Sequence, residues 1–371
     1  MKWVLVFFFA ISLQFSFAYN QFVSRIIEPK NPDSLILFVS DYQYLKDCDS
    51  LYSTCFIQEK TFHPWAYIYE FGEDSIPTYL DTTYKIRLAQ MDVKSPFSFQ
   101  YNEAVLSMIN FYATRRPKHI ARALETKELY FPLFEEMLDK YHLPMELKYL
   151  AIVESALNPS AKSRAGAVGL WQFMPGTGQM YGLHINSKVD DRMDIYKSTE
   201  AACQHFADLY SRYQDWNLVL AAYNSGSGNV NKAIRRAGNS TDYWEIRQYL
   251  PKETQSYVPA FIAVNYMMQY ADAHNVQPVQ ENTISYFSID TIMVTKSLRF
   301  TQIADWLDLD LEIIKALNPQ YKKQIIPASE SRPYVLTLPN SKIGEFILNK
   351  ELIISGILRR DYESQALLQS Q

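Results

Sequence analysis

The feature that most constrains the fold is a helical hydrophobic period running from about residue 98 to residue 275. Apolar side chains recur there at intervals of three and four residues, which places them on one face of an α-helix. One stripe comprises Tyr101, Val105, Met108, Ile109 and Tyr112, and another comprises Leu129, Leu133, Phe134, Met137, Leu138 and Tyr141. No alternating pattern in this span is long enough for a strand, so the sequence predicts a mainly α-helical domain.

Within this span, residues 143–175 (LPMELKYLAIVESALNPSAKSRAGAVGLWQFMP) carry a carboxylate at a core position. Pro144 suits a first helical turn, and we expect a helix from Pro144 to about Leu157. Glu154 shares a helix face with the apolar Leu147. Burial disfavours the charged form and should raise the pKa of Glu154 above roughly 4.3. Such a group suits general acid catalysis; the alternative is a buried structural glutamate that pairs with an arginine or caps a neighbouring helix.

The N-terminus has the parts of a secretory signal peptide. Lys2 gives a basic start, an apolar run extends from Trp3 to Phe17, and Ala18 ends a site with the small residues that signal peptidase uses. We therefore predict a signal peptide at residues 1–18. The rival is an uncleaved membrane anchor, for which the run is too short. Residues 19–90 carry no interpretable motif and are treated as an N-terminal extension of unknown role.

The net charge restricts the possible binding partners, and the cysteine and histidine positions restrict the possible disulfides and metal sites. Removing residues 1–18 takes Lys2 from the 36 basic residues and leaves 35 against 40 acidic ones, a net charge of −5. This balance argues against nucleic acid as a partner. An exported location allows a disulfide between Cys48 and Cys55, whereas Cys203 lies in a helical pattern as a small buried residue. Because the six histidines are scattered, the sequence predicts no metal site and no cofactor.

The hydrophobic pattern changes near Asn282. Short strand-like and helical segments follow, which predicts a small β-α-α-β module at residues 283–341 behind a helical domain at residues 91–275. A C-terminal tail at residues 342–371 completes the chain. The expected elements of the module are a strand at 284–294, helices at 300–307 and 311–317, and a strand at 334–338.

Several short motifs occur in a fixed order within the helical span. They are Glu154-Ser155, Gly169-Leu170-Trp171-Gln172, Ala222-Tyr223-Asn224, and Glu253-Thr254 followed by Tyr257-Val258. In this order, behind a signal peptide, they resemble lytic transglycosylases of the soluble-lytic-transglycosylase type (glycoside hydrolase family 23), and the membrane-bound lytic transglycosylase D group in particular. The resemblance implies a lysozyme-like helical domain. It also implies cleavage of the β-1,4 bond between N-acetylmuramic acid and N-acetylglucosamine in peptidoglycan, with 1,6-anhydromuramoyl ends.

The resemblance also implies roles for individual residues. Glu154 is the sole catalytic acid and base. The implied substrate-binding residues are Ser163, Gln172, Met174, Tyr223, Asn224 and Tyr257. Tyr223 is expected to hydrogen-bond Glu154 or the substrate, and Trp171 either fills the core or widens the apolar wall of the site. The structural alternatives are a loop cap for Ser163 and ordinary core tyrosines for Tyr223 and Tyr257.

Ordinary glycosidases use a pair of carboxylates, so a second acid near Glu154 would favour hydrolysis. The nearest acidic cluster in the sequence is Asp190, Asp191 and Asp194, beside Arg192. We interpret it as an ion-paired loop before a helix, and a hydrolytic muramidase as the alternative if one of these carboxylates faces Glu154. A non-catalytic peptidoglycan-binding protein is a further alternative.

The C-terminal module resembles a lysin-motif (LysM) domain. Its Phe300-Thr301-Gln302-Ile303-Ala304 segment and its Asn318-Pro319 pair carry the resemblance, whereas the usual Gly-Asp-Thr turn is replaced by Thr295-Lys296-Ser297-Leu298. Glycan binding and a purely structural role therefore stay open for this module. The implied partner of the whole chain is the peptidoglycan glycan strand, with membrane or wall association, in the periplasm or cell envelope of a bacterium.

Overall fold

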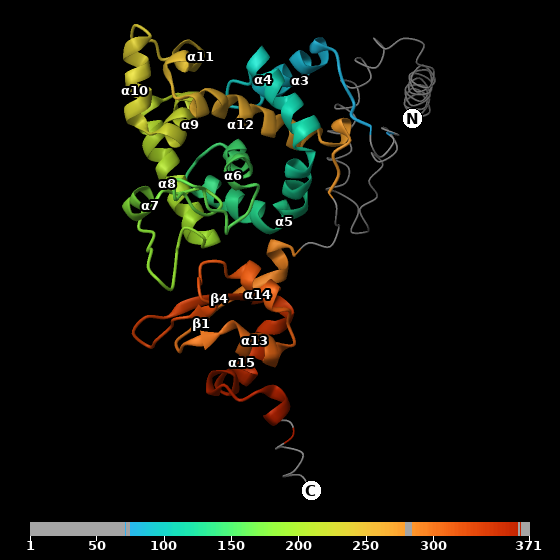
Figure 1. Cartoon of the computed structure of the whole chain (residues 1–371), viewed down its shortest axis with the longest axis vertical. Coiled ribbons are helices and arrows are strands. Elements are labelled where there is room, and N and C mark those ends of the chain that lie inside the picture. The colour runs from blue at the N-terminus through green and yellow to red at the C-terminus, as the bar shows by residue number, and fades with distance from the viewer. Residues whose placement is uncertain (1–70, 72–74, 279–283, 363, 365–371) are drawn as a thin grey trace, which may run out of the picture. The chain divides into compact units, whose positions relative to one another are not determined.

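The computed structural model describes residue 71 and residues 75–278, 284–362 and 364 (Figure 1). The described residues all belong to one compact unit, Tyr69–Gln371. The predicted signal peptide, most of the N-terminal extension, Cys48 and Cys55 lie outside the described residues.

The first part of this unit is helical. Its elements are α3 (Asp81–Val93), α4 (Glu103–Asn110), the π-helix η2 (Phe111–Arg115), α5 (Pro117–Lys140), the 3₁₀-helix η3 (Met145–Tyr149), α6 (Leu150–Ser155), α7 (Pro175–Met180), α8 (Ile195–Tyr213), α9 (Trp216–Ser225), α10 (Ser227–Arg236), α11 (Tyr243–Ile246), η4 (Arg247–Tyr249), α12 (Lys252–Tyr270) and η5 (Asp272–His274). The expected mainly helical domain is thereby confirmed.

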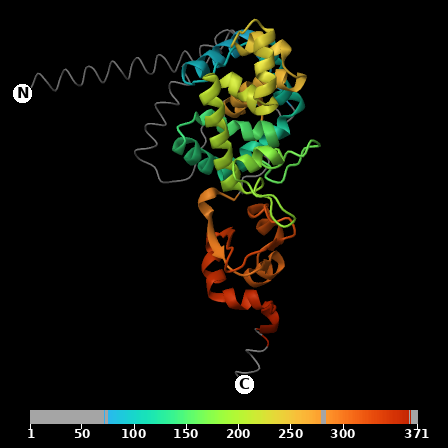
Figure 2. The ribbon, with the colours of Figure 1, turned by 90° about the vertical axis from the view of Figure 1, so that its left-hand side faces the viewer.

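Helix α12 is the centre of this domain. Almost every side chain from Tyr257 to Met267 is buried, as expected for a helix that is apolar on all sides. It packs against α4, α6 and α9. Figures 1 and 2 show these helices from two directions at right angles. The core also takes in Tyr84 and Leu88 of α3, so the packed domain begins earlier than residue 91.

The helix predicted from Pro144 to Leu157 is shorter and less regular. Residues 145–149 form η3, and α6 ends at Ser155 because Ala156 and Leu157 adopt left-handed backbone angles, with φ of 51° and 57°. The chain reverses there, which places Glu154 in the last turn of α6. From there its carboxylate accepts a hydrogen bond from Tyr257 of α12.

The loop after α6 folds back on itself in a tight arrangement. Val168 forms isolated β-bridges with Lys162 and with Phe173. Gly169, with φ of +91°, lies so close to a neighbouring segment that a Cβ atom would come within 1.9 Å of the Arg192 carbonyl oxygen. Only glycine fits such an approach.

The C-terminal module has its own hydrophobic core. Strands β1 and β4 pair antiparallel, with Ile289 opposite Pro339 and Val294 opposite Tyr334. The two predicted helices occur at the predicted residues, whereas the short β2–β3 pair is additional. The elements are η6 (Tyr286–Ser288), β1 (Ile289–Val294), β2 (Leu298–Arg299), α13 (Phe300–Leu307), α14 (Leu311–Leu317), β3 (Ile325–Ile326), β4 (Tyr334–Pro339) and α15 (Asn340–Ser355).

The segment treated as a C-terminal tail takes part in this packing. Phe346 and Ile353 of α15 are fully buried in the second core. Among the described residues, none of the helices combines the length and the apolar character that a membrane crossing requires.

Candidate active site

A cavity of about 720 Å³ lies where α6, the loop after it, α9 and α12 meet. It brings together every site residue predicted from the sequence, although these residues lie up to 103 positions apart in the chain. Lining it are Glu154, Ser163, Gln172, Met174, Tyr223, Asn224 and Tyr257. The roles of these residues remain predictions, but their convergence on one cavity is a structural fact.

Glu154 lines this cavity and is held there by one hydrogen bond. The Tyr257 hydroxyl donates to Glu154 Oε1. Burial raises the pKa of Glu154 to about 7, the Tyr257 hydrogen bond lowers it, and the negative charge of Glu253 raises it. Because desolvation outweighs the hydrogen bond, the carboxyl holds its proton near neutral pH, as a general acid requires.

Tyr223 does not make the hydrogen bond to Glu154 that was one of its two expected roles. Its hydroxyl donates instead to the carbonyl oxygen of Trp171, at 2.8 Å. Burial, followed by the nearby charge of Glu154, raises the pKa of Tyr223 well above its usual value, so the phenol stays neutral. The reason for the difference is geometric, since Tyr257 on α12 reaches Glu154 while Tyr223 on α9 faces the loop.

The loop residues are fixed mainly by backbone hydrogen bonds. Ser163 Oγ accepts from the Ala167 amide at 3.0 Å, so this side chain caps its loop as well as lining the cavity. Gln172 Nε2 donates to the Gly169 carbonyl at 2.8 Å, and Met174 is 43% exposed at the rim. Trp171 is buried and donates to Thr199 Oγ1, so it fills the core.

Asn224 ties two of the motifs together. Its Oδ1 atom accepts a hydrogen bond from Thr254 Oγ1 at 2.8 Å. Thr254 is itself buried at the start of α12. This contact joins the end of α9 to the helix that carries Tyr257, and so fixes the two walls of the cavity relative to each other.

Among the polar residues that line the cavity without a role expected from the sequence are Glu253 and His205. Glu253 supplies a second carboxylate, and its place beside Thr254 in the fourth motif was the signal that could have revealed it. The His205 ring lies tilted against the Tyr223 ring, with 5.0 Å between the centroids, and burial lowers the pKa of His205 to about 4. His205 is therefore neutral at pH 7, and nothing in the α8 sequence singles it out.

The acidic cluster of residues 190–194 does not line the cavity. Asp190 pairs with Arg192, Asp191 pairs with Lys197, and Asp194 caps α8 by accepting from the Lys197 amide. This agrees with the interpretation of an ion-paired loop before a helix. None of these carboxylates is placed to act with Glu154.

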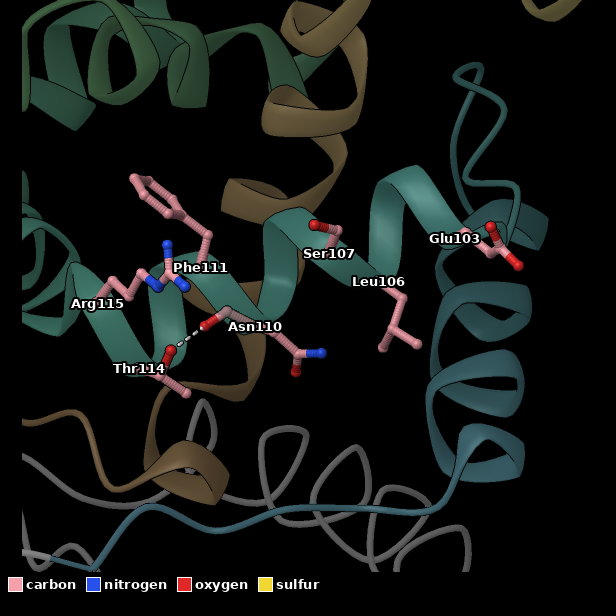
Figure 3. A pocket seen from close by; sticks show the side chains of 7 residues that line it. All are labelled: Glu103, Leu106, Ser107, Asn110, Phe111, Thr114 and Arg115. Carbon is pink, nitrogen blue, oxygen red and sulfur yellow. Dashed lines mark hydrogen bonds between the residues drawn. The ribbon is translucent and has the colours of Figure 1, made fainter.

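A second cavity, of about 460 Å³, lies on α4 and η2 (Figure 3). Phe111 is common to both cavities, but none of the predicted site residues lines the second one. Within the described part of the chain, no group of three or more histidine, cysteine, aspartate or glutamate side chains is arranged to hold a metal ion.

Two family models match separate parts of the chain. Residues 132–246 match the family described as "Transglycosylase SLT domain", and residues 288–354 match "Lytic transglycosylase MltD, LysM-like domain". The chain carries an SLT domain followed by a LysM-like domain. The SLT match contains Glu154, Ser163 and Tyr223 and ends before Tyr257.

Individual relatives agree with this assignment. The chain is 34% identical over 221 residues to "Membrane-bound lytic murein transglycosylase D" of Escherichia coli K12, covering 58% of this chain and 47% of that protein. It is 30% identical over 125 residues to "Putative soluble lytic murein transglycosylase" of Haemophilus influenzae, covering 32% and 21%. It thus spans about half the length of the E. coli relative.

A solved structure is also similar. It is the 70 kDa soluble lytic transglycosylase of E. coli, with a TM-score of 0.33 and 27% identity over 42% of this chain and 27% of that one.

Proposed function

We propose that this protein is a peptidoglycan lytic transglycosylase that cleaves the β-1,4 bond between N-acetylmuramic acid and N-acetylglucosamine. The observation that carries the proposal is Glu154, a carboxyl with a pKa of about 7 that opens into the cavity shared by all the predicted site residues. The SLT domain around it supports the choice of substrate.

Glu154 would act twice in one turnover. In its neutral form it donates its proton to the glycosidic oxygen as the bond from that oxygen to C1 of the muramoyl residue breaks. Tyr257 donates a hydrogen bond to Glu154, and so steadies the carboxylate that results. The carboxylate then removes the proton from the C6 hydroxyl as that oxygen attacks C1. The proton returns to Glu154, no water is consumed, and the sugar ends as a 1,6-anhydro ring.

Hydrolysis is the second candidate reaction, because Glu253 places another carboxylate at the same cavity. Many glycosidases use two carboxyl groups, one of which serves as nucleophile or activates water. In the lytic transglycosylase reaction Glu253 acts only through its negative charge, which raises the pKa of Glu154.

We propose that the protein is exported and acts in the periplasm or cell envelope, where the predicted signal peptide would place it. The LysM-like module adds a candidate second contact with glycan strands, supported by its family match.

Digestion of purified peptidoglycan tests the function. The wild-type protein should release soluble fragments that mass spectrometry identifies as ending in 1,6-anhydromuramic acid. Fragments with reducing muramic acid ends would support the muramidase instead. Binding to the polymer without release of fragments would support a non-catalytic binding protein.

The pH dependence of cleavage should follow the proton on Glu154. Because the acid must be neutral, kcat/KM should fall as pH rises through about 7, the pKa of Glu154. Tyr257→Phe removes a hydrogen bond that favours the charged form, so this falling limb should move to higher pH by roughly half a unit to one unit. Glu253→Gln removes a like charge and should move it to lower pH. Shifts of the same sign in both variants would contradict this assignment.

A further inference from the structure

The loop that forms one wall of the cavity accepts two hydrogen bonds from the buried side chain of Arg192. Arg192 Nη1 donates to the Gly166 carbonyl at 2.9 Å and to the Phe173 carbonyl at 3.0 Å. The residues between these two carbonyls include Ala167 and Gln172, which line the cavity. Arg192 is only 6% exposed and does not itself line the cavity, so its contact with the wall is structural.

Asp190 fixes the orientation of this arginine. Arg192 Nε and Nη2 each donate to one oxygen of the Asp190 carboxylate at 2.9 Å, in a two-point pairing. Asp190 is 2% exposed. Burial opposes ionisation of Asp190, but the Arg192 hydrogen bonds and charge hold its pKa below the usual range. The pair is therefore charged and geometrically defined.

The C-terminal module contacts the same segment from the other side. The Asp190 amide donates to the Gln320 carbonyl at 3.0 Å, and the Lys322 amide donates to the Lys188 carbonyl at 2.9 Å. Lys322 Nζ lies 3.4 Å from Asp190 Oδ2 and donates to the Asn186 carbonyl at 2.7 Å.

Val189 adds a buried apolar contact between this segment and the C-terminal module. It forms an isolated β-bridge with Tyr321 and is 2% exposed. It packs in the hydrophobic core of the module rather than in the core of the helical domain. A residue from the helical region is therefore part of the hydrophobic core of the module. The two regions share buried side-chain packing as well as hydrogen bonds.

We propose that the C-terminal module positions the wall of the catalytic cavity, acting through residues 320–322, the Asp190–Arg192 pair and the loop 163–173. A module that served only to bind glycan would need no link to the cavity. Here two backbone hydrogen bonds and an ion pair connect the module to the buried Asp190–Arg192 pair, and Arg192 donates to the carbonyl groups that shape the wall. The expected effect on catalysis rests on the proposed function, whereas the structural connection between the module and the loop does not.

Val189→Asp in the full-length chain tests the link, because it places a carboxylate in the module core and should displace residues 320–322. Hydrogen–deuterium exchange is the first readout. The amides of Gly169 and Phe173, which hydrogen-bond within the loop, should exchange at least about tenfold faster than in the wild type. Amides in the middle of α12 serve as the internal reference and should be unchanged.

The second readout is cleavage of a soluble, uncross-linked peptidoglycan tetrasaccharide. We expect kcat to fall roughly tenfold with a smaller change in KM, because a displaced wall misplaces the sugar relative to Glu154. Faster exchange at the Lys322 amide with unchanged protection at Gly169 and Phe173 would overturn the proposal. If the wild type cleaves no glycan, the proposed function fails, but the exchange result still decides whether the module positions the loop.

A milder pair of variants keeps the test valid if the aspartate variant does not fold. Lys322→Ala removes the ion pair with Asp190, and Lys315→Ala removes a similar pair with Glu312 on α14; the two lysine side chains are 28% and 30% exposed. Exchange at Phe173 should be about threefold faster in Lys322→Ala alone. Equal exchange in the two variants would overturn the proposal.

Discussion

Glu154→Gln should reduce peptidoglycan cleavage by at least about 10³-fold, because glutamine keeps the shape of the side chain but has no proton to donate. Its amide oxygen can still accept the hydrogen bond from Tyr257, so the cavity should keep its form. Product release from purified peptidoglycan measures the effect. Glu136→Gln, which changes an exposed glutamate on α5, is the matched control and should retain wild-type activity. Substantial turnover by the Glu154 variant would contradict the assignment.

The same variant separates the catalytic interpretation from the structural alternative by its stability. The folded-state pKa of Glu154 is raised to about 7, so between its ordinary pKa and pH 7 the unfolded chain releases a proton that the folded protein keeps. The free energy of unfolding therefore falls as pH rises through this window and stays lower above it. Glutamine removes this penalty.

Urea unfolding at pH 8 and at pH 4 measures the free energy of unfolding of the wild type and of Glu154→Gln. At pH 8 Glu154→Gln should be the more stable protein, by at most about 3 kcal/mol and by less to the extent that solvent in the cavity reaches the carboxylate. At pH 4, just below the ordinary pKa of glutamate, residue 154 is mostly neutral in both states of the wild type, so the advantage should be small. A structural glutamate that needed its charge for an ion pair would show the opposite, a loss of stability at pH 8.

Gly169→Ala is the second change with a large expected effect. Its φ of +91° is unfavourable for alanine, and the new Cβ would meet the Arg192 carbonyl oxygen at 1.9 Å. Gly166 has nearly the same φ, +90°, but nothing within 4 Å of its Cβ position. Alanine at residue 166 should therefore cost only the backbone strain, about 1 to 2 kcal/mol, and at residue 169 more than about 3 kcal/mol.

The comparison of these two variants isolates the close approach of the cavity wall to residue 192. Denaturant unfolding gives the two costs, and cleavage assays should show a much larger loss for the residue 169 variant because the Arg192 hydrogen bonds to the loop are displaced. Equal destabilisation by the two alanines would mean that the backbone contact at residue 192 relaxes without cost.

The helices of this chain were largely predictable because their apolar stripes are long and regular. Helices α13 and α14 begin and end at the predicted residues. The helix that carries Glu154 was predicted too long, since Ala156 and Leu157 take left-handed backbone angles that neither residue type suggests. Tertiary contacts on either side of the reversal decide that conformation, and a local pattern does not contain them.

The residues of the site were predictable from the sequence, but several of their contacts were not. The order of the four motifs within one helical span indicated Glu154 and residues that share its cavity, although each motif alone is short and common. The sequence did not decide which tyrosine reaches Glu154, since that depends on how α9 and α12 pack. Nor did it predict that Lys322 contacts Asp190, because the two residues lie in segments with unrelated patterns.

The most direct test of the account is to digest purified peptidoglycan in water enriched in oxygen-18 and to analyse the new sugar ends by mass spectrometry. In the proposed reaction the C6 hydroxyl of the muramoyl residue replaces water, so the fragments should end in anhydro rings without the heavy isotope. Incorporation of one heavy oxygen at each new reducing end would show that water is the nucleophile and would contradict the account.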